Sequence, residues 1–233
     1  SIGEANESGG EEEKNKDITD SINYAQRIQR AILSDVNEIK EKIPESFIFF
    51  KPKDIVSGDF YWFSHKEETT FIAAADCTGH GVPGAFMSMI ANSFLNEVVN
   101  EKNIFQPDLV LNELREKIIK ALRQKGESLE NKDGLDISFC ALKENMLLFA
   151  GANNPLWVIR NLDNNSEFDE KKPLKNDKYK LVEIPSDKQP IGTHPNPSPF
   201  TLRILPLMKG DAVYLFTDGY ADQFGGPKGK KFK

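Results

Sequence analysis

Three aspartates stand at the ends of apolar segments, and each lies close to a glycine. Asp59 occurs in Val-Ser-Gly-Asp-Phe-Tyr, Asp76 in Ala-Ala-Ala-Asp-Cys-Thr-Gly-His-Gly and Asp218 in Leu-Phe-Thr-Asp-Gly. Buried carboxylates that converge without a partner are costly, so such a cluster needs a cation. Hard oxygen ligands without a His/Cys cluster favour magnesium or manganese over zinc. The pattern predicts a Mg²⁺ or Mn²⁺ site and metal-assisted chemistry on a phosphate.

The composition indicates one globular domain with a short extension. The chain has 233 residues and a net charge of −6, which argues against a nucleic-acid partner. Residues 1–16 are rich in Glu, Gly and Ser, and we expect a disordered acidic tail there. No apolar run is long enough to span a membrane, and no signal peptide is visible. Cys77 and Cys140 lie in apolar runs, which favours reduced thiols and a cytoplasmic location.

Residues 17–43 are predicted to form a helix that ends before Pro44. Two interpretations fit this helix equally well. It could pack on the domain that follows, or it could be a coiled-coil linker that couples an upstream sensor module to the domain and could form a homodimer. Its apolar residues recur every three or four positions: Ile18, Ile22, Ala25, Ile28, Ile32, Val36 and Ile39.

The order of the remaining elements predicts an α+β fold with antiparallel sheets. Strands are expected first, then two adjacent helices, then more strands, and this order does not match a βαβ alternation. Residues 161–180 are polar and predict a surface loop. The expected strands cover residues 46–51, 59–65, 69–77, 135–142, 146–151, 156–160, 200–207 and 211–217, and the expected helices cover 83–100 and 107–125, the second stopped by Gly126.

The first hairpin brings two of the aspartates together. Asp59 and Asp76 are equidistant from a turn centred between Glu67 and Glu68, so a regular antiparallel pairing would put their Cβ atoms about 4.5–5.5 Å apart. Two carboxylates at that distance repel unless a cation or a proton intervenes. Glu-Glu is a poor tight-turn pair, however, so a bulge could shift the register, and each aspartate could instead cap a turn beside its glycine.

Further carboxylates could join this pair. Asp218 would reach the same edge if its strand lies beside the hairpin. Asp133 and Asp136 are possible additions, although both could equally be turn residues.

The segment from Gly79 to Gly84 matches Gly-x-Gly-x-x-Gly after an apolar strand and at the start of a helix. A dinucleotide-binding unit would need a second parallel strand after that helix, but a second helix is expected there. Glycines also let the backbone approach a metal or a phosphate, so Gly79, His80 and Gly81 are candidate substrate-binding residues. His80 could act as a general acid, but a loop histidine that holds the turn is the favoured interpretation.

Five motifs in a fixed order carry a family resemblance. They begin at Val56 (Val-Ser-Gly-Asp-Phe-Tyr), Ala75 (Ala-Asp-Cys-Thr-Gly-His-Gly-Val-Pro-Gly-Ala), Ala150 (Ala-Gly-Ala-Asn-Asn-Pro), Gln189 (Gln-Pro-Ile-Gly) and Leu215 (Leu-Phe-Thr-Asp-Gly-Tyr). Residues 44–233 resemble the SpoIIE-like branch of the PPM-type, protein phosphatase 2C-like, metal-dependent serine/threonine phosphatases. The helix before them resembles the linker that precedes this domain in many bacterial signalling proteins.

The resemblance implies an αββα sandwich and a two-metal site. It implies that Asp76 bridges two Mn²⁺ or Mg²⁺ ions, that Asp59 and the carbonyl of Cys77 bind one of them, and that Asp218 binds the other. The implied reaction is hydrolysis of phosphoserine or phosphothreonine by a metal-activated water, often on a small anti-sigma-factor antagonist. No Cys or Ser is placed as a nucleophile beside a base, so no phosphoenzyme is expected.

Two departures from the family pattern affect the expected activity. Ser57 stands where the family usually has a second glycine. The family pattern also continues past Phe232 with a helix and a strand carrying Asp-Asp, whose aspartate completes the second metal site. We therefore expect weak or no phosphatase activity from the 233-residue chain and activity from a longer parent. The alternative function is a non-catalytic signalling module that keeps the fold and binds a partner protein.

Overall fold

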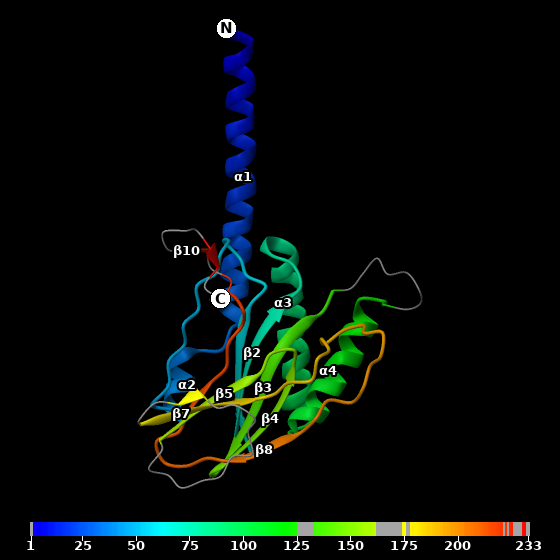
Figure 1. Ribbon diagram of the computed structural model, residues 1–233. Coiled ribbons are helices and arrows are strands. Elements are labelled where there is room, and N and C mark those ends of the chain that lie inside the picture. Colours follow the sequence, from blue (N-terminus) through cyan, green and yellow to red (C-terminus); the bar gives the residue numbers. More distant parts are fainter. Residues whose placement is uncertain are drawn as a thin grey trace.

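The structure is a computed structural model that describes residues 2–124, 133–161, 174–175, 178–220, 222, 224–225 and 230–231. Two antiparallel sheets form the main body, and one long helix projects from it (Figure 1). None of the described helices is both long and apolar enough to cross a membrane. The helices are α1 (Ile2–Ile32), α2 (Val36–Lys42), α3 (Gly81–Asn96), which a π-helical turn (Glu97–Glu101) continues, and α4 (Pro107–Ala121).

Sheet A has the strand order β1-β2-β3-β4-β8, and sheet B has the order β6-β7-β5-β9. Every described ladder in both sheets is antiparallel. The strands of sheet A are β1 (Phe60–Lys66), β2 (Thr69–Cys77), β3 (Leu135–Lys143), β4 (Met146–Ala152) and β8 (Arg203–Pro206). Those of sheet B are β5 (Leu156–Asn161), β6 (Leu174–Lys175), β7 (Tyr179–Ile184) and β9 (Ala212–Tyr214), and a separate ribbon is formed by β10 (Phe224–Gly225) and β11 (Lys230–Lys231).

Two hydrophobic clusters hold the layers together. One fills the space between sheet A and helices α3 and α4, and the other lies between the two sheets. β3 contributes to both, because successive side chains of a strand point to opposite faces: Phe139 belongs to the first cluster and Cys140 to the second. The expectation of an α+β fold built on two antiparallel sheets is confirmed. Cys77 and Cys140 are both buried and free, as expected.

The N-terminal helix differs from the expected one at both ends. α1 also covers residues 2–16, where composition predicted disorder. Glu and Lys are good helix formers, and Glu12 and Lys16 have the favourable i,i+4 spacing, so a helix anchored further along can continue into solvent. At the other end α1 stops at Ile32, and α2 starts anew after Asp35, whose carboxylate accepts a 2.8 Å hydrogen bond from the amide of Asn37. This N-cap interrupts what the periodicity predicted as one helix.

Three other segments also differ from expectation. Residues 46–51 form no strand, because no described strand pairs with them; Phe47 and Phe49 are 74% and 76% exposed. The predicted loop 161–180 contains β6 and the start of β7, although most of it lies outside the described residues. β7 was missed because its burial is slight, with only Val182 fully buried. Gly126, the predicted helix stop, also lies outside the described residues, and α4 already ends at Ala121.

Candidate active site

The β1–β2 hairpin places Asp59 and Asp76 opposite each other. Phe60 pairs with Ala75 at the open end of the ladder, so the next opposed positions are 59 and 76. Both aspartates therefore lie at the same edge of sheet A, at the end from which α1 projects (Figure 1). This is the arrangement that the sequence predicted for a regular hairpin.

The turn of this hairpin is tight and has no bulge. Lys66 pairs directly with Thr69, and the two residues between them, Glu67 and Glu68, have φ angles of 47° and 60°. Left-handed backbone at both turn positions is what a two-residue type I′ hairpin turn requires. Glutamates are poor residues for it, so the long, buried ladder imposes the turn and not the reverse.

Asp218 completes a cluster of three carboxylates. The side chain of Asp76 lies within hydrogen-bonding reach of both Asp59 and Asp218. Burial, followed by the two neighbouring carboxylates, raises the pKa of Asp76 to about 8. Residues far apart in the sequence are thus brought together, and both burial and the neighbouring carboxylates disfavour the ionised form of Asp76.

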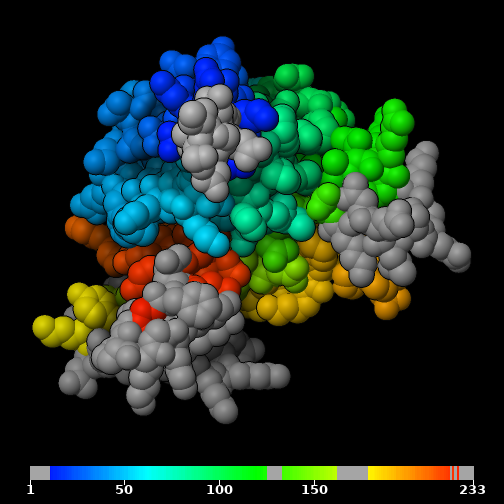
Figure 2. Space-filling model, turned by 90° about the horizontal axis from the view of Figure 1, so that it is seen from above, coloured from blue at the N-terminus to red at the C-terminus, as the bar shows by residue number. Residues whose placement is uncertain are grey.

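The loop after β9 fastens Asp218 to the hairpin. The hydroxyl of Thr217 donates a 2.7 Å hydrogen bond to Oδ2 of Asp59. The backbone of Gly219 approaches the same carboxylate so closely that an added Cβ would lie 3.3 Å from Oδ2. Figure 2 looks onto this end of the molecule, where the red surface of the chain around residues 215–220 meets the cyan surface of residues 50–60.

The glycine-rich loop of residues 79–84, which follows β2, has a backbone shape that depends on its glycines. Gly79 and Gly81 have φ angles of 89° and 61°, so both use the left-handed backbone that glycine adopts without strain. Gly84, in the first turn of α3, lies against the carbonyl of Gly79, where a Cβ would be only 2.5 Å from the oxygen. α3 is followed by α4 and not by a parallel strand, so the dinucleotide-binding alternative is wrong.

His80 has a carboxylate partner that the sequence did not reveal. Its Nδ1 lies 3.3 Å from Oδ2 of Asp54, and its side chain is 84% exposed. The pair borders an open groove of about 630 Å³ between α1 and the start of α3. The groove is lined by Ile22, Lys53, Asp54, Ile55, Val56, Gly81 and Val82.

Asp136 lies directly across the β2–β3 ladder from Asp76. Burial raises its pKa, and a 2.8 Å hydrogen bond from the side-chain amide of Asn153 opposes that shift. Asp136 is therefore a neighbour of the cluster and no turn residue. The main chain of Asp133, by contrast, packs against Gly192: a Cβ added to Gly192 would lie 3.3 Å from the carbonyl oxygen of Asp133.

The structure thus brings Asp59, Asp76 and Asp218 together. The carbonyl oxygen of Cys77 lies close to Gly58, the residue before Asp59: a Cβ added to Gly58 would be 3.1 Å from that oxygen. Sequence reasoning did not find the residues that hold these groups in place. Each is a polar side chain with nothing in its local pattern to show its partner. They are Gln29, Asp54, Asn153 and Thr217.

The family model of stage II sporulation protein E (SpoIIE) matches residues 66–233, more than two thirds of the chain. The chain belongs to the SpoIIE family. This confirms the expected SpoIIE-like branch of the PP2C-like phosphatases. A comparison with curated protein sequences gave no match.

Solved structures of SpoIIE-family and other PP2C-type proteins have the same fold. The SiaA-PP2C domain of Pseudomonas aeruginosa is 30% identical, with 94% of this chain and 79% of that chain covered and a TM-score of 0.75. The PP2C phosphatase domain of SpoIIE from Bacillus subtilis, with a fragment of its regulatory domain, is 17% identical over 72% of this chain, with a TM-score of 0.51, and only 43% of that chain is covered. RsbX in complex with magnesium is 12% identical, with 78% and 74% covered and a TM-score of 0.50.

In this SpoIIE-family chain, α1 is bonded to the loop that carries Asp59. The buried amide of Gln29 donates to the carbonyl of Ser57 at 2.6 Å and accepts from the amide of Ser57 at 3.1 Å. It also donates to the hydroxyl of Ser88 on α3 at 2.9 Å. The C-terminal part of α1 therefore packs on the domain, whereas the apolar side chains of Ile18 and Ile28 remain exposed.

We expect Gln29→Ala to destabilise the fold by about 1–3 kcal/mol, because the buried N–H of Ser57 loses its side-chain partner, whereas its C=O keeps the hydrogen bond from the Ser88 hydroxyl at 3.2 Å. Urea unfolding would measure the change. Asn23→Ala, on the exposed side of the same helix, should change stability by less than about 0.5 kcal/mol. Equal stability of the Gln29 and Asn23 variants would show that the hydrogen bonds of Gln29 to Ser57 do not stabilise the fold.

Cys77 is unsuited to be a nucleophile. Its side chain is buried in the main core, and burial raises the pKa of its thiol far above the usual range. We expect Cys77→Ser to cost about 1–3 kcal/mol of stability, because the new hydroxyl is buried. If the carboxylate cluster binds Mn²⁺, its affinity should be unchanged, because the thiol is buried in the apolar core. Calorimetric titration would test this, with Cys77→Ala as control; loss of binding in both folded variants would assign a role to the thiol.

Proposed function

We propose that this chain is a metal-dependent protein phosphatase domain that hydrolyses phosphoserine or phosphothreonine on a signalling protein. The observation that carries the proposal is the contact of Asp76 with both Asp59 and Asp218. Three carboxylates from separate segments have no structural reason to converge at a strand end, because their repulsion destabilises the fold. Membership of a phosphatase family supports the same conclusion.

The donor set fits a hard divalent cation. Three carboxylates and the main-chain carbonyl of Cys77 offer oxygen ligands of the kind that Mg²⁺ and Mn²⁺ prefer. Within the described part of the chain, no group of three or more His, Cys, Asp or Glu side chains forms a ready-made metal site. The carboxylates meet in pairs instead, with Asp76 as the shared member, which fits a bridging role for Asp76. We propose Asp59, Asp76, Asp218 and the Cys77 carbonyl as metal ligands.

A divalent cation bound there would lower the pKa of a water and neutralise charge on the phosphate. The residues of the chain orient the carboxylates that would hold this cation. Thr217 holds one oxygen of Asp59, so that the other stays available. The buried thiol of Cys77 excludes a covalent thiol route. Asp59, Asp76 and Asp218 are therefore the residues on which we expect activity to depend.

On the substrate side, we propose that Gly79, His80 and Gly81 receive the phosphate. Main-chain N–H groups at the first turn of a helix attract anions, and this turn of α3 contains no acidic residue. His80 stands at the N-cap position but makes no side-chain cap hydrogen bond, so it leaves those N–H groups to a ligand. Lys53 adds a positive charge at the neighbouring groove.

For partners, we propose a phosphoprotein such as an anti-sigma-factor antagonist, and an upstream sensor module joined through α1. α1 also offers exposed apolar side chains for a homodimer: Ile18, Tyr24, Ile28 and Ile32. Sedimentation of wild type and Ile28→Asp would test the dimer. A wild type that stays monomeric at high concentration would exclude it.

The proposed reaction can be tested by single-turnover release of phosphate from a phosphoserine peptide, with protein and Mn²⁺ in excess so that slow turnover is measurable. We expect release that requires Mn²⁺ and falls by about two orders of magnitude or more in Asp218→Asn. Asp20→Asn removes the same charge from the exposed surface of α1 and should leave the rate unchanged. Tight Mn²⁺ binding without any release would instead favour the non-catalytic, partner-binding module.

A further inference from the structure

β9 leads the chain to Asp218, yet its own pairing specifies its position weakly. It is three residues long, lies at the edge of sheet B, and pairs only with β5 in the described part of the chain. A slip of one residue would turn every side chain of β9 to the opposite face. Something outside the ladder must fix the register.

A buried ion pair stands at the start of this ladder. Ile159 pairs with Ala212, so Arg160 and Asp211 are the next opposed residues. Nε of Arg160 donates to Oδ1 and Oδ2 of Asp211 at 2.8 and 3.0 Å, and Nη2 also contacts Oδ2. Both side chains are almost fully buried, at 3% and 2% exposure. The pair therefore fits only one register of β9 on β5.

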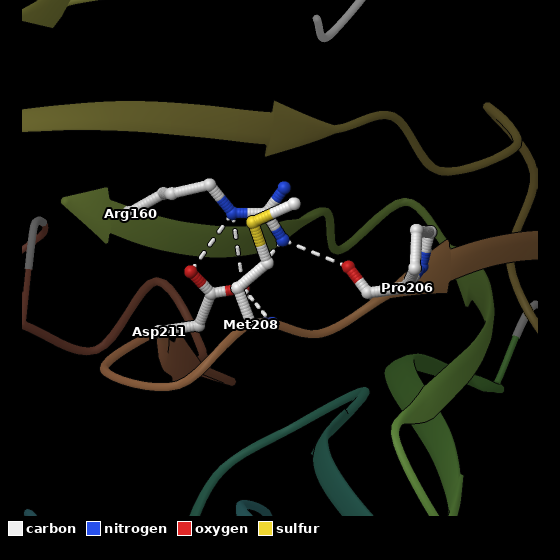
Figure 3. A network of polar contacts seen from close by, with 4 residues as sticks. All are labelled: Arg160, Pro206, Met208 and Asp211. Atoms are coloured by element: carbon white, nitrogen blue, oxygen red, sulfur yellow. Dashed lines mark hydrogen bonds and ion pairs between the residues drawn. The ribbon is translucent and has the colours of Figure 1, made fainter. Parts of the chain in front are cut away.

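The same pair closes the corner where the chain crosses from sheet A to sheet B. β8 ends at Pro206 in sheet A, and β9 begins at Ala212 in sheet B. Nη2 of Arg160 donates to the carbonyl of Pro206 at 2.8 Å, and the amide of Met208 donates to Oδ2 of Asp211 at 2.9 Å. Figure 3 shows the guanidinium of Arg160 facing the Asp211 carboxylate and the Pro206 carbonyl together. The Arg160–Asp211 pair thus contacts both the corner between the sheets and the start of β9.

Downstream of β9 the chain reaches the cluster within a few residues. Phe216 packs on Trp157 of β5 with ring centroids 4.4 Å apart, Thr217 bonds to Asp59, and Asp218 contacts Asp76. A shift of β9 by one position would displace both of the last two contacts.

We infer that the Arg160–Asp211 pair, held at the corner between the sheets, is a positioning device that sets the register of β9 and so delivers Asp218 to Asp76. A buried ion pair adds little stability relative to well-packed apolar residues of the same size. Its contribution here is the selection of one register. The inference rests on the proposed role of Asp218 in the metal site.

The first test is hydrogen exchange on the metal-free chain, which needs no metal chemistry. The double variant Arg160→Met/Asp211→Leu replaces the pair by apolar side chains. We expect amides of residues 212–218 to exchange about tenfold faster or more, with the β3 and β4 amides unchanged. Unchanged exchange over 212–218 would overturn the inference, whatever the fate of the proposed function. Should the double variant not fold, Arg160→Lys, which keeps the charge but not the planar fork, serves in the same measurement with the same expected direction.

The second test separates positioning from stability. We expect the double variant to bind Mn²⁺ about 10- to 100-fold more weakly at a temperature where it is fully folded. Lys102→Met/Glu113→Leu removes an ion pair on the helical side of the domain and should keep the parent affinity. Parent affinity in a folded Arg160/Asp211 variant would refute the positioning role. A wild type that binds no Mn²⁺ would refute the proposed metal site, while the exchange measurement still decides the register.

Discussion

Asp76→Asn is expected to stabilise the metal-free chain at pH 8, by about 2 kcal/mol once solvent screening of this partly exposed group is allowed for, and to abolish its response to Mn²⁺. The pKa of Asp76 is raised to about 8 by burial and by Asp59 and Asp218, whereas in the unfolded chain it is near the ordinary value of 3.8. The folded state therefore keeps a proton that the unfolded chain releases. Stability contributed by this group is present below about pH 4 and is lost as the pH rises towards 8.

An asparagine carries no charge to lose. Its amide can also donate to the two neighbouring carboxylates, which the ionised aspartate cannot do. The advantage of Asp76→Asn should accordingly shrink as the pH is lowered from 8 to 4. Mn²⁺ should offset this advantage, because a ligand present at a hundredfold excess over its dissociation constant stabilises the wild type by about 2.7 kcal/mol and the variant not at all.

Urea unfolding in EDTA and in Mn²⁺, across pH 4–8, measures both effects. Asp20→Asn is the matched control, since it removes an exposed carboxylate from α1. If Asp76→Asn is less stable than wild type at pH 8 without metal, the three carboxylates do not repel one another as described. If it responds to Mn²⁺ as the wild type does, Asp76 is not a ligand.

Gly84→Ala should destabilise the fold by about 1–3 kcal/mol, although alanine normally favours a helix by up to about 1 kcal/mol over glycine. Gly84 lies in the first turn of α3, and a Cβ there would lie 2.5 Å from the carbonyl oxygen of Gly79 and 3.0 Å from Cα of Gly58. Both contacts are with backbone that cannot rotate away. To relieve these contacts, the segments at Gly58 and Gly79 must shift. Gly58 directly precedes Asp59, and Gly79 follows Asp76 by three residues, so Mn²⁺ affinity should fall as well.

Thermal unfolding and Mn²⁺ titration would measure the effect of Gly84→Ala. Gly225→Ala is the control, because a Cβ at Gly225 meets nothing within 4 Å, and its stability should change by less than about 0.5 kcal/mol. A Gly84 variant as stable as the Gly225 variant would mean that the loop is softer than its contacts indicate.

Much of the site could be read from local pattern. A regular hairpin over residues 60–75 put Asp59 opposite Asp76, and the structure has that register without the bulge that the sequence left possible. The contribution of Asp218 could be stated only on condition that its strand lay nearby, because pairing between distant segments leaves no trace in either segment alone. The strand expected at 46–51 was wrong for the same reason, since Phe47 and Phe49 have β propensity but no described strand pairs with their segment.

Hydrophobic periodicity and glycine positions were enough to establish the α+β class and the helices after the hairpin, and to predict that residues 59 and 76 face each other in a regular hairpin, because these depend on contacts close in sequence. Only the folded chain showed that Asp218 touches Asp76, that Gln29 holds the loop before Asp59, and that Arg160 pairs with Asp211. Those contacts span tens to more than a hundred residues. They arise because two sheets and a helix bury their apolar faces together, and the packing then decides which polar groups meet.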